Sequence, residues 1–488
     1  SEMTETGGAA LLEKEGRVAK AWAEVLKLPV SSFAISANFF DFGGSLAFFQ
    51  LTKALNAEFG TELTVANLLA SPTLVAMTAL MFSDATAVAV EFSADAEVAK
   101  FPIVPQLKGA PVLPAAVSEV MSQMVLDSYH ALPKKSILIT GCTGYVGAFA
   151  MESLARRSDV TSVVALVRAK NPTAAAERLR ATCHKRAIDE SDDFETWFAK
   201  VTPVCGDVAQ ERFGLSETGY ATLAMSVHAV FHGAAEVNML KPVAALAPAN
   251  VGGTSNVLAL CALARLPMLI TSTMLPLEGE KPTGYRQSKE AAEALCLKAR
   301  VDYGVPSTVL QLGDIGIGLS ASKRALPDED AIVIMLRACI KVGMIPCNPA
   351  WSVSIMPVNQ CTDMLARLML DAPAADQMTS KAREVKGDLV RWDTLCEWIA
   401  PALPDVAPCD LVDWKEEVAM VAELDDTLAG EYPAGAVASS KRMLMLLPSM
   451  EQEFAAEERR RQDGKGAEGE LVADAAWGAR FGAALAAE

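Results

Sequence analysis

Histidine is scarce in this sequence and closely spaced cysteines are missing, which narrows the kinds of site it can hold. Only four histidines occur in 488 residues, and the ten cysteines include no C-x-x-C pair. Zinc ribbons and thioredoxin-type redox sites need such spacings, so these classes are excluded. His228 and His232 lie four residues apart, but they flank an apolar run and we assign them to packing. We therefore expect no metal site, and reduced thiols in a cytosol-like compartment.

Basic residues are also in deficit. The chain has 43 Lys and Arg against 60 Asp and Glu, a net charge of −17. Such a chain repels nucleic-acid backbones and anionic lipid surfaces. No apolar run is long enough to cross a bilayer, and no secretory signal pattern is present. We therefore expect a soluble, cytoplasmic protein of two to four domains, with neither nucleic acid nor membrane as a partner.

What the sequence does contain is a glycine-rich stretch, SILITGCTGYVG, at residues 136–147. A short apolar run reads as a strand buried on both faces, and residues 148–155 continue with a helical pattern. Glycines allow a tight turn, and the helix start behind them offers free N–H groups to a pyrophosphate. A plain strand–turn–helix with small residues would share this pattern. The candidate cofactor contacts are Thr140, Gly141, Thr143, Gly144, Tyr145, Val146 and Gly147.

Two further predicted strands carry polar side chains suited to a dinucleotide. Residues 161–170 end in Arg168, a cation where NAD-binding proteins place an acid, which favours the 2′-phosphate of NADP(H). Arg178 and Arg180 lie on the following helix, either as a second clamp or as an exposed face. Residues 201–208 form a third strand, with Asp207 and Val208 placed for the adenine.

A Tyr-x-x-x-Lys pair completes the pattern. Tyr285 and Lys289 lie one helical turn apart on one face, downstream of a hydroxyl at a strand end, Thr273. A nearby ammonium stabilises tyrosinate, so we expect Lys289 to lower the pKa of Tyr285 and make it a usable general acid. Thr273 would hold a substrate carbonyl. The predicted catalytic set is Thr273, Tyr285 and Lys289.

Together these motifs resemble the extended short-chain dehydrogenase/reductase superfamily, and within it the terminal thioester reductase domains of carboxylic acid reductases and nonribosomal peptide or polyketide synthases. The matching pieces are TGCTGYVG, ALVRAK, GDVAQERFGL, FHGAAEVN, ANVGGT, GYRQSK, VGMIP and MPVNQ. The resemblance implies a Rossmann-type, doubly wound parallel sheet that binds NADPH. It implies that Asn250, Tyr285 and Lys289 also contact the cofactor, although a polar group bonded to its own helix is the alternative for Asn250.

The chain departs from that family at two places. Gln311-Leu312 stands where the family usually has Arg-Pro. Thr273 lies only twelve positions before Tyr285, where related reductases have a longer loop. Twelve residues span at most about 40 Å, so the two side chains can still meet.

The first part of the chain, residues 10–83, reads as a helical bundle. Its segment NFFDFGGSLAFFQL resembles the attachment motif of peptidyl-type carrier domains, with one residue fewer between Gly44 and the serine. The resemblance implies that Ser45, at the start of a helix, carries 4′-phosphopantetheine. Either the loop is one residue shorter in this chain, or a modified serine next to Ser45 is missing from the printed sequence. An unmodified bundle with a Gly-Gly turn is the further alternative.

The remaining boundaries follow from composition. Residues 84–134 are a linker rich in Ala and Pro, with a helix at 117–129. Residues 135–319 form the NADP(H)-binding domain and residues 320–488 a smaller, mostly helical substrate-binding part. There we expect Trp351, Trp392, Trp398 and Trp414 to pack in a core, and residues 451–470 to form a solvated charged helix.

The expected function is NADPH-dependent release of a tethered acyl or peptidyl thioester as an aldehyde, with further reduction to the alcohol left open. A phosphopantetheinyl transferase and upstream adenylation or synthase domains would be its partners. One alternative is a reductase of free carbonyl or acyl-CoA substrates with a vestigial carrier domain. The other is a non-enzymatic interaction module, which would not need an acid such as Tyr285.

Overall fold

The structure is a computed structural model, which divides into two compact units. It describes residues 13–39, 42, 45–61, 68, 71–82, 92–103, 113–238, 241–274, 282–313, 315–316, 318, 326–327, 330–371, 382–385, 387–424, 432–433, 435–462 and 475–486. The first unit is mainly Ser1–Phe92, with the short segments Asn238–Ala245 and Thr283–Tyr285 assigned to it, and the second unit holds the rest.

The first unit is helical, as predicted. Its elements are α1 (Glu13–Leu26), η1 (Val30–Ser32), α2 (Ser45–Phe59) and α4 (Leu74–Phe82). Val18 and Trp22 lie one helical turn apart on α1 and are fully buried. The Trp22 ring meets Phe33 and Phe39 edge-on, with centroids 5.5 and 5.1 Å apart. This aromatic cluster is the core that holds the helices together.

The second unit is built on a seven-stranded sheet of order β10-β6-β5-β4-β1-β2-β3. All of its strand pairs are parallel. Its strands are β1 (Lys135–Thr140), β2 (Val160–Val167), β3 (Val201–Cys205), β4 (Ala229–His232), β5 (Met268–Thr273), β6 (Ser307–Leu312) and β10 (Arg383–Val385). The chain runs outward from β1 to β3 and then returns to β4. The strand order therefore reverses between β1 and β4, and the predicted doubly wound sheet is confirmed.

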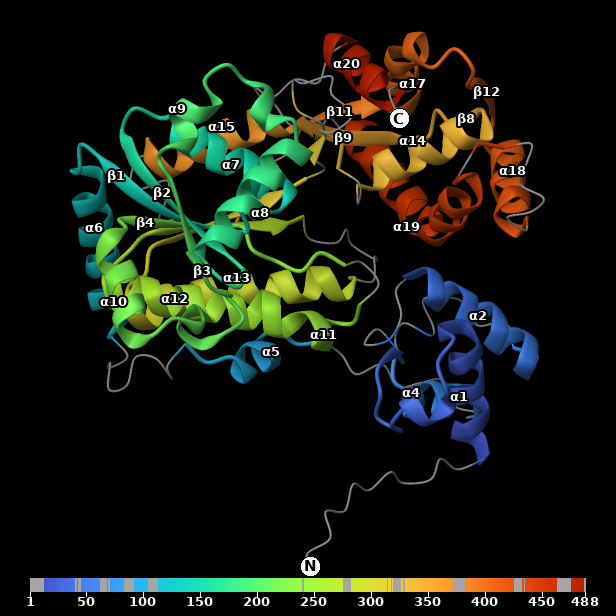
Figure 1. Cartoon of the computed structure of the whole chain (residues 1–488), viewed down its shortest axis with the longest axis horizontal. Helices are drawn as coiled ribbons and strands as arrows, with labels where there is room; N and C mark the ends of the chain where they lie inside the picture. The colour runs from blue at the N-terminus through green and yellow to red at the C-terminus, as the bar shows by residue number, and fades with distance from the viewer. Residues whose placement is uncertain are drawn as a thin grey trace, which may run out of the picture. The chain divides into compact units, whose positions relative to one another are not determined.

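Helices cover both faces of this sheet (Figure 1). One layer consists of α7 (Tyr145–Arg156), α8 (Pro172–Lys185), α9 (Phe194–Phe198) and α15 (Val358–Leu370), and the other of α10 (Glu217–Ser226), α12 (Gly253–Ala264) and α13 (Gly284–Tyr303). Short connecting helices are η4 (Ile188–Glu190), η5 (Glu211–Gly214), α11 (Val243–Ala247) and the π-helical turn η6 (Pro248–Gly252). β1 is buried along its whole length, as expected for a strand covered on both sides.

The stretch predicted to be a linker contains two helices. The expected helix is α6 (Ala115–His130), and an unexpected shorter one is α5 (Ala94–Lys100), capped by Ser93, which accepts from the Ala96 N–H. Both belong to the second unit. The domain boundaries themselves stay predictions.

The C-terminal part adds two small sheets, of order β11-β9-β7 and β12-β8. Their strands are β7 (Ile315–Gly316), β8 (Met344–Cys347), β9 (Ser352–Pro357), β11 (Asp388–Arg391) and β12 (Ala407–Asp410). The helices around them are α14 (Ala331–Val342), α17 (Trp392–Ile399), η8 (Ala400–Ala402), α18 (Leu411–Glu423), α19 (Ala436–Gln462) and α20 (Ala475–Ala486). Trp351, Trp392 and Trp414 are buried in the hydrophobic core of this C-terminal part, and Trp398 packs against that core, as predicted.

The prediction of a solvated helix at 451–470 is wrong for its first half. Phe454 is buried between Trp351 and Trp392, with ring centroids 5.5 and 5.7 Å away. Glu458 is buried too, and accepts hydrogen bonds from Ser352 and Arg461. The charged composition misled the prediction because the carboxylate is paired inside the fold. Residues 463–470 lie outside the described residues.

Among the described residues, one helical stretch, Val243–Ala264, is long and apolar enough to cross a membrane. Of its most apolar window, 72% is buried inside the structure. Burial of that kind is typical of a core helix, so the stretch is weak evidence for a membrane span.

Candidate active site

The predicted cofactor residues gather at the carboxyl edge of the sheet, where β1 and β4 lie side by side. Thr140 ends β1, His232 ends β4, and the two are register partners. In an open parallel sheet this edge, at the reversal of strand order, is where ligands bind. The sheet topology therefore places the glycine-rich turn at the expected position.

The glycine-rich turn is built so tightly that side chains would not fit. Gly141 has φ of +78°, and a Cβ there would collide with the backbone of Gly233. A Cβ at Gly147 would collide with the carbonyl of Gly141. Gly144 is the N-cap of α7 and donates to the Gly141 carbonyl at 2.8 Å. This cradle leaves backbone N–H groups at the helix start, and it fits a dinucleotide pyrophosphate.

The basic residues beside β2 divide into two groups. Arg168 follows the last residue of β2 and is exposed, and Arg178 donates to the Arg168 carbonyl at 2.6 Å. Arg180 instead forms a two-point pair with Glu195 on α9, at 2.7 and 2.9 Å. Arg168 and Arg178 are thus adjacent, whereas Arg180 pairs with Glu195, which favours the alternative of an exposed helical face for Arg180.

The turn after β3 is held to α12. Asp207 accepts from the Ala209 N–H at 3.0 Å, and its own N–H donates to Phe213. Asn256 donates to the Val208 carbonyl at 2.7 Å. The predicted adenine contacts therefore lie in an ordered turn at the same edge of the sheet.

A buried hydrogen-bond chain that sequence reasoning missed starts at the glycine-rich turn. His232 shares hydrogen bonds with Thr140 through Nδ1 at 2.7 Å and with Thr254 through Nε2 at 3.1 Å. The Thr254 hydroxyl donates to the Asn250 carbonyl at 2.7 Å, so Nε2 must donate to Thr254 and Nδ1 must accept from Thr140. Burial, and next the charge of Lys289, lower the pKa of His232 to about 3, which keeps the ring neutral.

Asn250 extends this chain to the helix that bears the predicted catalytic pair. It lies in the π-helical turn η6, its Nδ2 donates to Ser288 on α13 at 2.9 Å and to the Glu236 carbonyl at 3.0 Å, and its Oδ1 accepts from the Glu236 N–H. π-Helical turns are frequent at functional sites because they redirect a side chain. The structure therefore favours the network role of Asn250 over a bond to its own helix.

Tyr285 and Lys289 lie on α13 and are both buried, at 9% and 3% exposure. Burial raises the pKa of Tyr285 to about 12 and lowers the pKa of Lys289 to about 8. The expected lowering of the Tyr285 pKa is therefore wrong for this structure, since desolvation disfavours the tyrosinate. A protonated phenol remains able to donate a proton at neutral pH.

Thr273 is the last residue of β5 and is partly buried. The segment 275–281, which contains most of the short loop, lies outside the described residues. The meeting of Thr273 with Tyr285 thus stays a prediction. Ser45 is the first residue of α2, while its side chain and the residues Asp41, Gly43 and Gly44 lie outside the described part of the chain.

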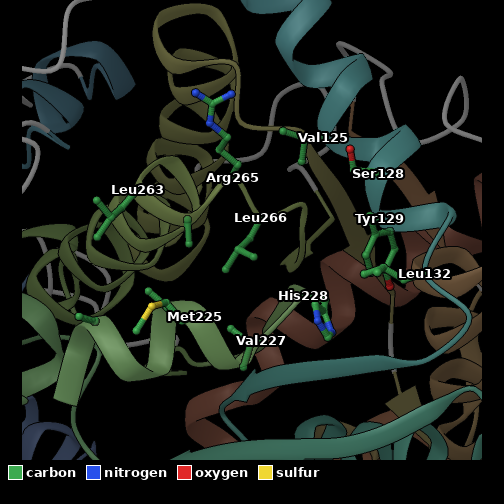
Figure 2. Close-up of a pocket in the computed structure, with 13 residues that line it drawn as sticks. Val125, Ser128, Tyr129, Leu132, Met225, Val227, His228, Leu263, Arg265 and Leu266 are labelled. Atoms are coloured by element: carbon green, nitrogen blue, oxygen red, sulfur yellow. The ribbon is translucent and has the colours of Figure 1, made fainter. Parts of the chain in front are cut away.

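A pocket of about 590 Å³ lies elsewhere, at the opposite edge of the sheet. Figure 2 shows His228, Leu266 and Leu132 around it, and these residues precede β4, β5 and β1. The Nδ1 of His228 accepts from the Ser136 N–H at 2.9 Å, which supports its assignment to packing. Among the described residues no group of three potential metal ligands occurs.

Two family profiles match the chain. The family described as Phosphopantetheine attachment site matches residues 16–81, and the one described as Male sterility protein matches residues 139–282 and 267–365. A curated relative, the L-2-aminoadipate reductase large subunit of Penicillium chrysogenum, is 34% identical over 270 residues, 49% of this chain. The chain spans 19% of that relative's length, and 27% and 24% of the next two curated relatives.

Solved structures agree with this division. A thiolation-reductase di-domain from an archaeal non-ribosomal peptide synthetase is similar over 97% of both chains, with a TM-score of 0.62 and 16% identity. The terminal R domain from the myxalamid PKS-NRPS pathway covers 75% of this chain and 96% of its own, with a TM-score of 0.56 and 24% identity. At these identities the likeness establishes the fold. Residues 16–81 therefore match the phosphopantetheine attachment-site family and residues 139–365 the Male sterility protein family, and the fold is that of a thiolation-reductase di-domain.

Proposed function

We propose that the chain is a reductase that releases a carrier-bound acyl or peptidyl thioester as an aldehyde, with NADPH as the reductant. The observation that carries the proposal is the buried Tyr285–Lys289 pair on α13. A hydrogen-bond chain joins that helix, through Ser288, Asn250, Thr254 and His232, to Thr140 at the start of the glycine-rich turn. The presence of a carrier domain in the same chain supports a tethered substrate over a free one.

The residues present fit both prosthetic groups. Gly141, Gly144 and Gly147 would hold the pyrophosphate, and Arg168 with Arg178 the 2′-phosphate, while Ser45 would bear 4′-phosphopantetheine. When bound, the two groups supply the hydride and the tethered thioester, and the balanced reaction turns acyl thioester, NADPH and a proton into aldehyde, thiol and NADP⁺.

The chain's own residues would supply the acid. Tyr285 donates its phenolic proton to the carbonyl oxygen as negative charge develops there, and Thr273 donates a hydrogen bond to the same atom. The ammonium of Lys289 stabilises the tyrosinate that remains. The neutral, fixed His232 keeps Asn250 and Ser288 in place behind the pair.

We further propose that a phosphopantetheinyl transferase and upstream adenylation or synthase domains are the partners, and that the protein works in the cytoplasm. All ten cysteines are free thiols, which supports a reducing compartment.

Tyr285→Phe tests this function. It should lower kcat by about 10²–10⁴-fold, the usual contribution of a general acid, and leave the Kd of NADPH unchanged, because only the proton donor is lost. The measurement is NADPH oxidation with an acyl thioester of pantetheine as substrate, with aldehyde trapped as its hydrazone. If Tyr285→Phe turned over at the wild-type rate, Tyr285 would not be the proton donor. If the wild-type protein reduced free aldehydes but not the thioester, the alternative of a reductase of free carbonyl substrates would be favoured.

A further inference from the structure

Glu293 is a partly buried carboxylate that the proposed reaction does not use. It lies four residues after Lys289 and eight after Tyr285 on α13, so the three side chains share one face of the helix. Its hydrogen bonds reach two strands of the sheet.

The contacts of Glu293 join α13 to two adjacent strands. Ser272 on β5 donates a short hydrogen bond to one carboxylate oxygen, and Gln311 on β6 donates to the other at 2.9 Å. Ser272 and Gln311 are register partners, and both are buried, at 6% and 3% exposure. One carboxylate therefore bridges a pair of neighbouring strands directly before β5 ends at Thr273.

Most of the buried apolar side chains on α13 are small. Four of its five fully buried apolar side chains are small, namely Ala291, Ala292, Cys296 and Ala299. Apolar contacts of this kind are non-directional, whereas hydrogen bonds specify an orientation. A satisfied buried polar network fixes a single arrangement instead.

The charges around Glu293 are few. On its own helix Lys289 attracts its carboxylate and Glu290 repels it, while Cys296 lies near Lys289. From the strands it meets the neutral Ser272 and Gln311, and the neutral His232 on β4 faces Lys289. Burial raises the pKa of Glu293, while the hydrogen bonds from Ser272 and Gln311 oppose that rise. The carboxylate in turn raises the pKa of Lys289 against the effect of burial.

We propose that Glu293 is a positioning residue, whose carboxylate ties α13 to β5 and β6 and so fixes the direction in which Tyr285 and Lys289 point. This inference rests on the proposed function for its link to catalysis. It also gives Gln311 a role, since a glutamine amide supplies the donor that completes the tie.

The test compares Glu293→Gln with Glu290→Gln, which removes the same charge three residues earlier on α13. Glu293→Gln should lower kcat by about tenfold or more, leave the KM of NADPH within about twofold, and move the alkaline limb of the kcat profile to lower pH. Glu290→Gln should change none of these by more than about twofold.

A second variant, Gln311→Leu, keeps the charge of Glu293 and removes only one donor. It should lower kcat without moving the alkaline limb, and its effect should not add to that of Glu293→Gln, since both break one network. If Glu293→Gln matched Glu290→Gln in kcat and in pH profile, the proposal would be overturned.

Amide hydrogen exchange separates this inference from the proposed function. If the wild-type protein showed no turnover, the proposed function would fail. Exchange rates in α13 and β5 would still test whether Glu293 holds the helix to the strands. Faster exchange there in Glu293→Gln than in Glu290→Gln supports the tie, and equal exchange refutes it.

Discussion

Lys289 and Tyr285 respond to the same burial in opposite directions. Desolvation disfavours whichever form is charged, so the pKa of the lysine falls to about 8 and that of the tyrosine rises to about 12. At neutral pH the phenol therefore keeps its proton, and most of the lysine is still an ammonium. The pair is poised to donate one proton.

These shifts predict the pH dependence of the reaction. In the proposed reaction the active form of Lys289 is its cation, which is present below its pKa and lost above it, so kcat/KM should fall as pH rises through about 8. Tyr285, with its pKa near 12, should not titrate in this range. The check is kcat/KM measured from pH 6 to about 10. A flat profile across that range would contradict the assignment.

The arginines beside β2 give a second prediction, with a matched control. Arg168→Ala should raise the Kd of NADPH by about tenfold to a hundredfold, as one to two charge-assisted bonds are lost, while leaving NADH unaffected. Arg180→Ala removes a nearby arginine that Glu195 already engages, so it should change neither affinity. Fluorescence titration with both cofactors makes the comparison. Equal losses for NADPH and NADH in Arg168→Ala would refute recognition of the 2′-phosphate.

At this scale, the residues found from the sequence are those whose chemistry depends on local spacing. Tyr285 and Lys289 lie one turn apart on a helix, so their spacing alone pairs them. His232, Thr254 and Glu293 act through partners 11 to 92 positions away in the chain, among them Thr140 and Ser272, and no local pattern signals such contacts. Their one signal was a polar residue in an otherwise apolar segment.

At the scale of elements, α19 shows how a charged sequence can be structural. Glu458 is buried beneath β9, where hydrogen bonds from Arg461, and next from Ser352 and Gln462, lower its pKa to about 2. Strands β1, β2 and β3 of the main sheet were predictable from apolar runs bounded by turns, whereas β10 was not predicted. The inner half of α19 was not, because its burial depends on Trp351 and Trp392, which lie far away in the sequence.

The depressed pKa of Glu458 predicts an acid-dependent contribution to stability. Its folded value lies below the ordinary 4.5, so the stabilisation is complete above about pH 4.5 and is lost as pH falls toward 2. Glu458→Gln should lower the free energy of unfolding by about 1–3 kcal/mol at pH 7, and by less as the pH falls through that window. Denaturant unfolding at several pH values checks this. Glu451→Gln, whose partner Lys415 lies at the surface, is the control and should be near neutral.

At the scale of the whole molecule, the order of the two family matches follows the predicted order of carrier and reductase. The order of the motifs along the chain made this predictable, because each motif marks the end of one strand or the start of one helix in the family that the chain resembles. The acyl group was not predictable, because the shape of a binding tunnel depends on side chains from many elements. The domain boundaries at residues 83, 134 and 319 stay predictions.

The most direct test of the account is the intact mass of the chain after incubation with a phosphopantetheinyl transferase and an acyl-CoA, before and after NADPH is added. The account predicts that the acyl-phosphopantetheine mass appears on the wild-type chain and not on Ser45→Ala. It then predicts that NADPH, but not buffer, removes the acyl mass and leaves the phosphopantetheine, because the aldehyde departs and the thiol remains. An acyl mass that persists in the presence of NADPH, or a chain that accepts no arm at all, would contradict carrier-bound thioester reduction.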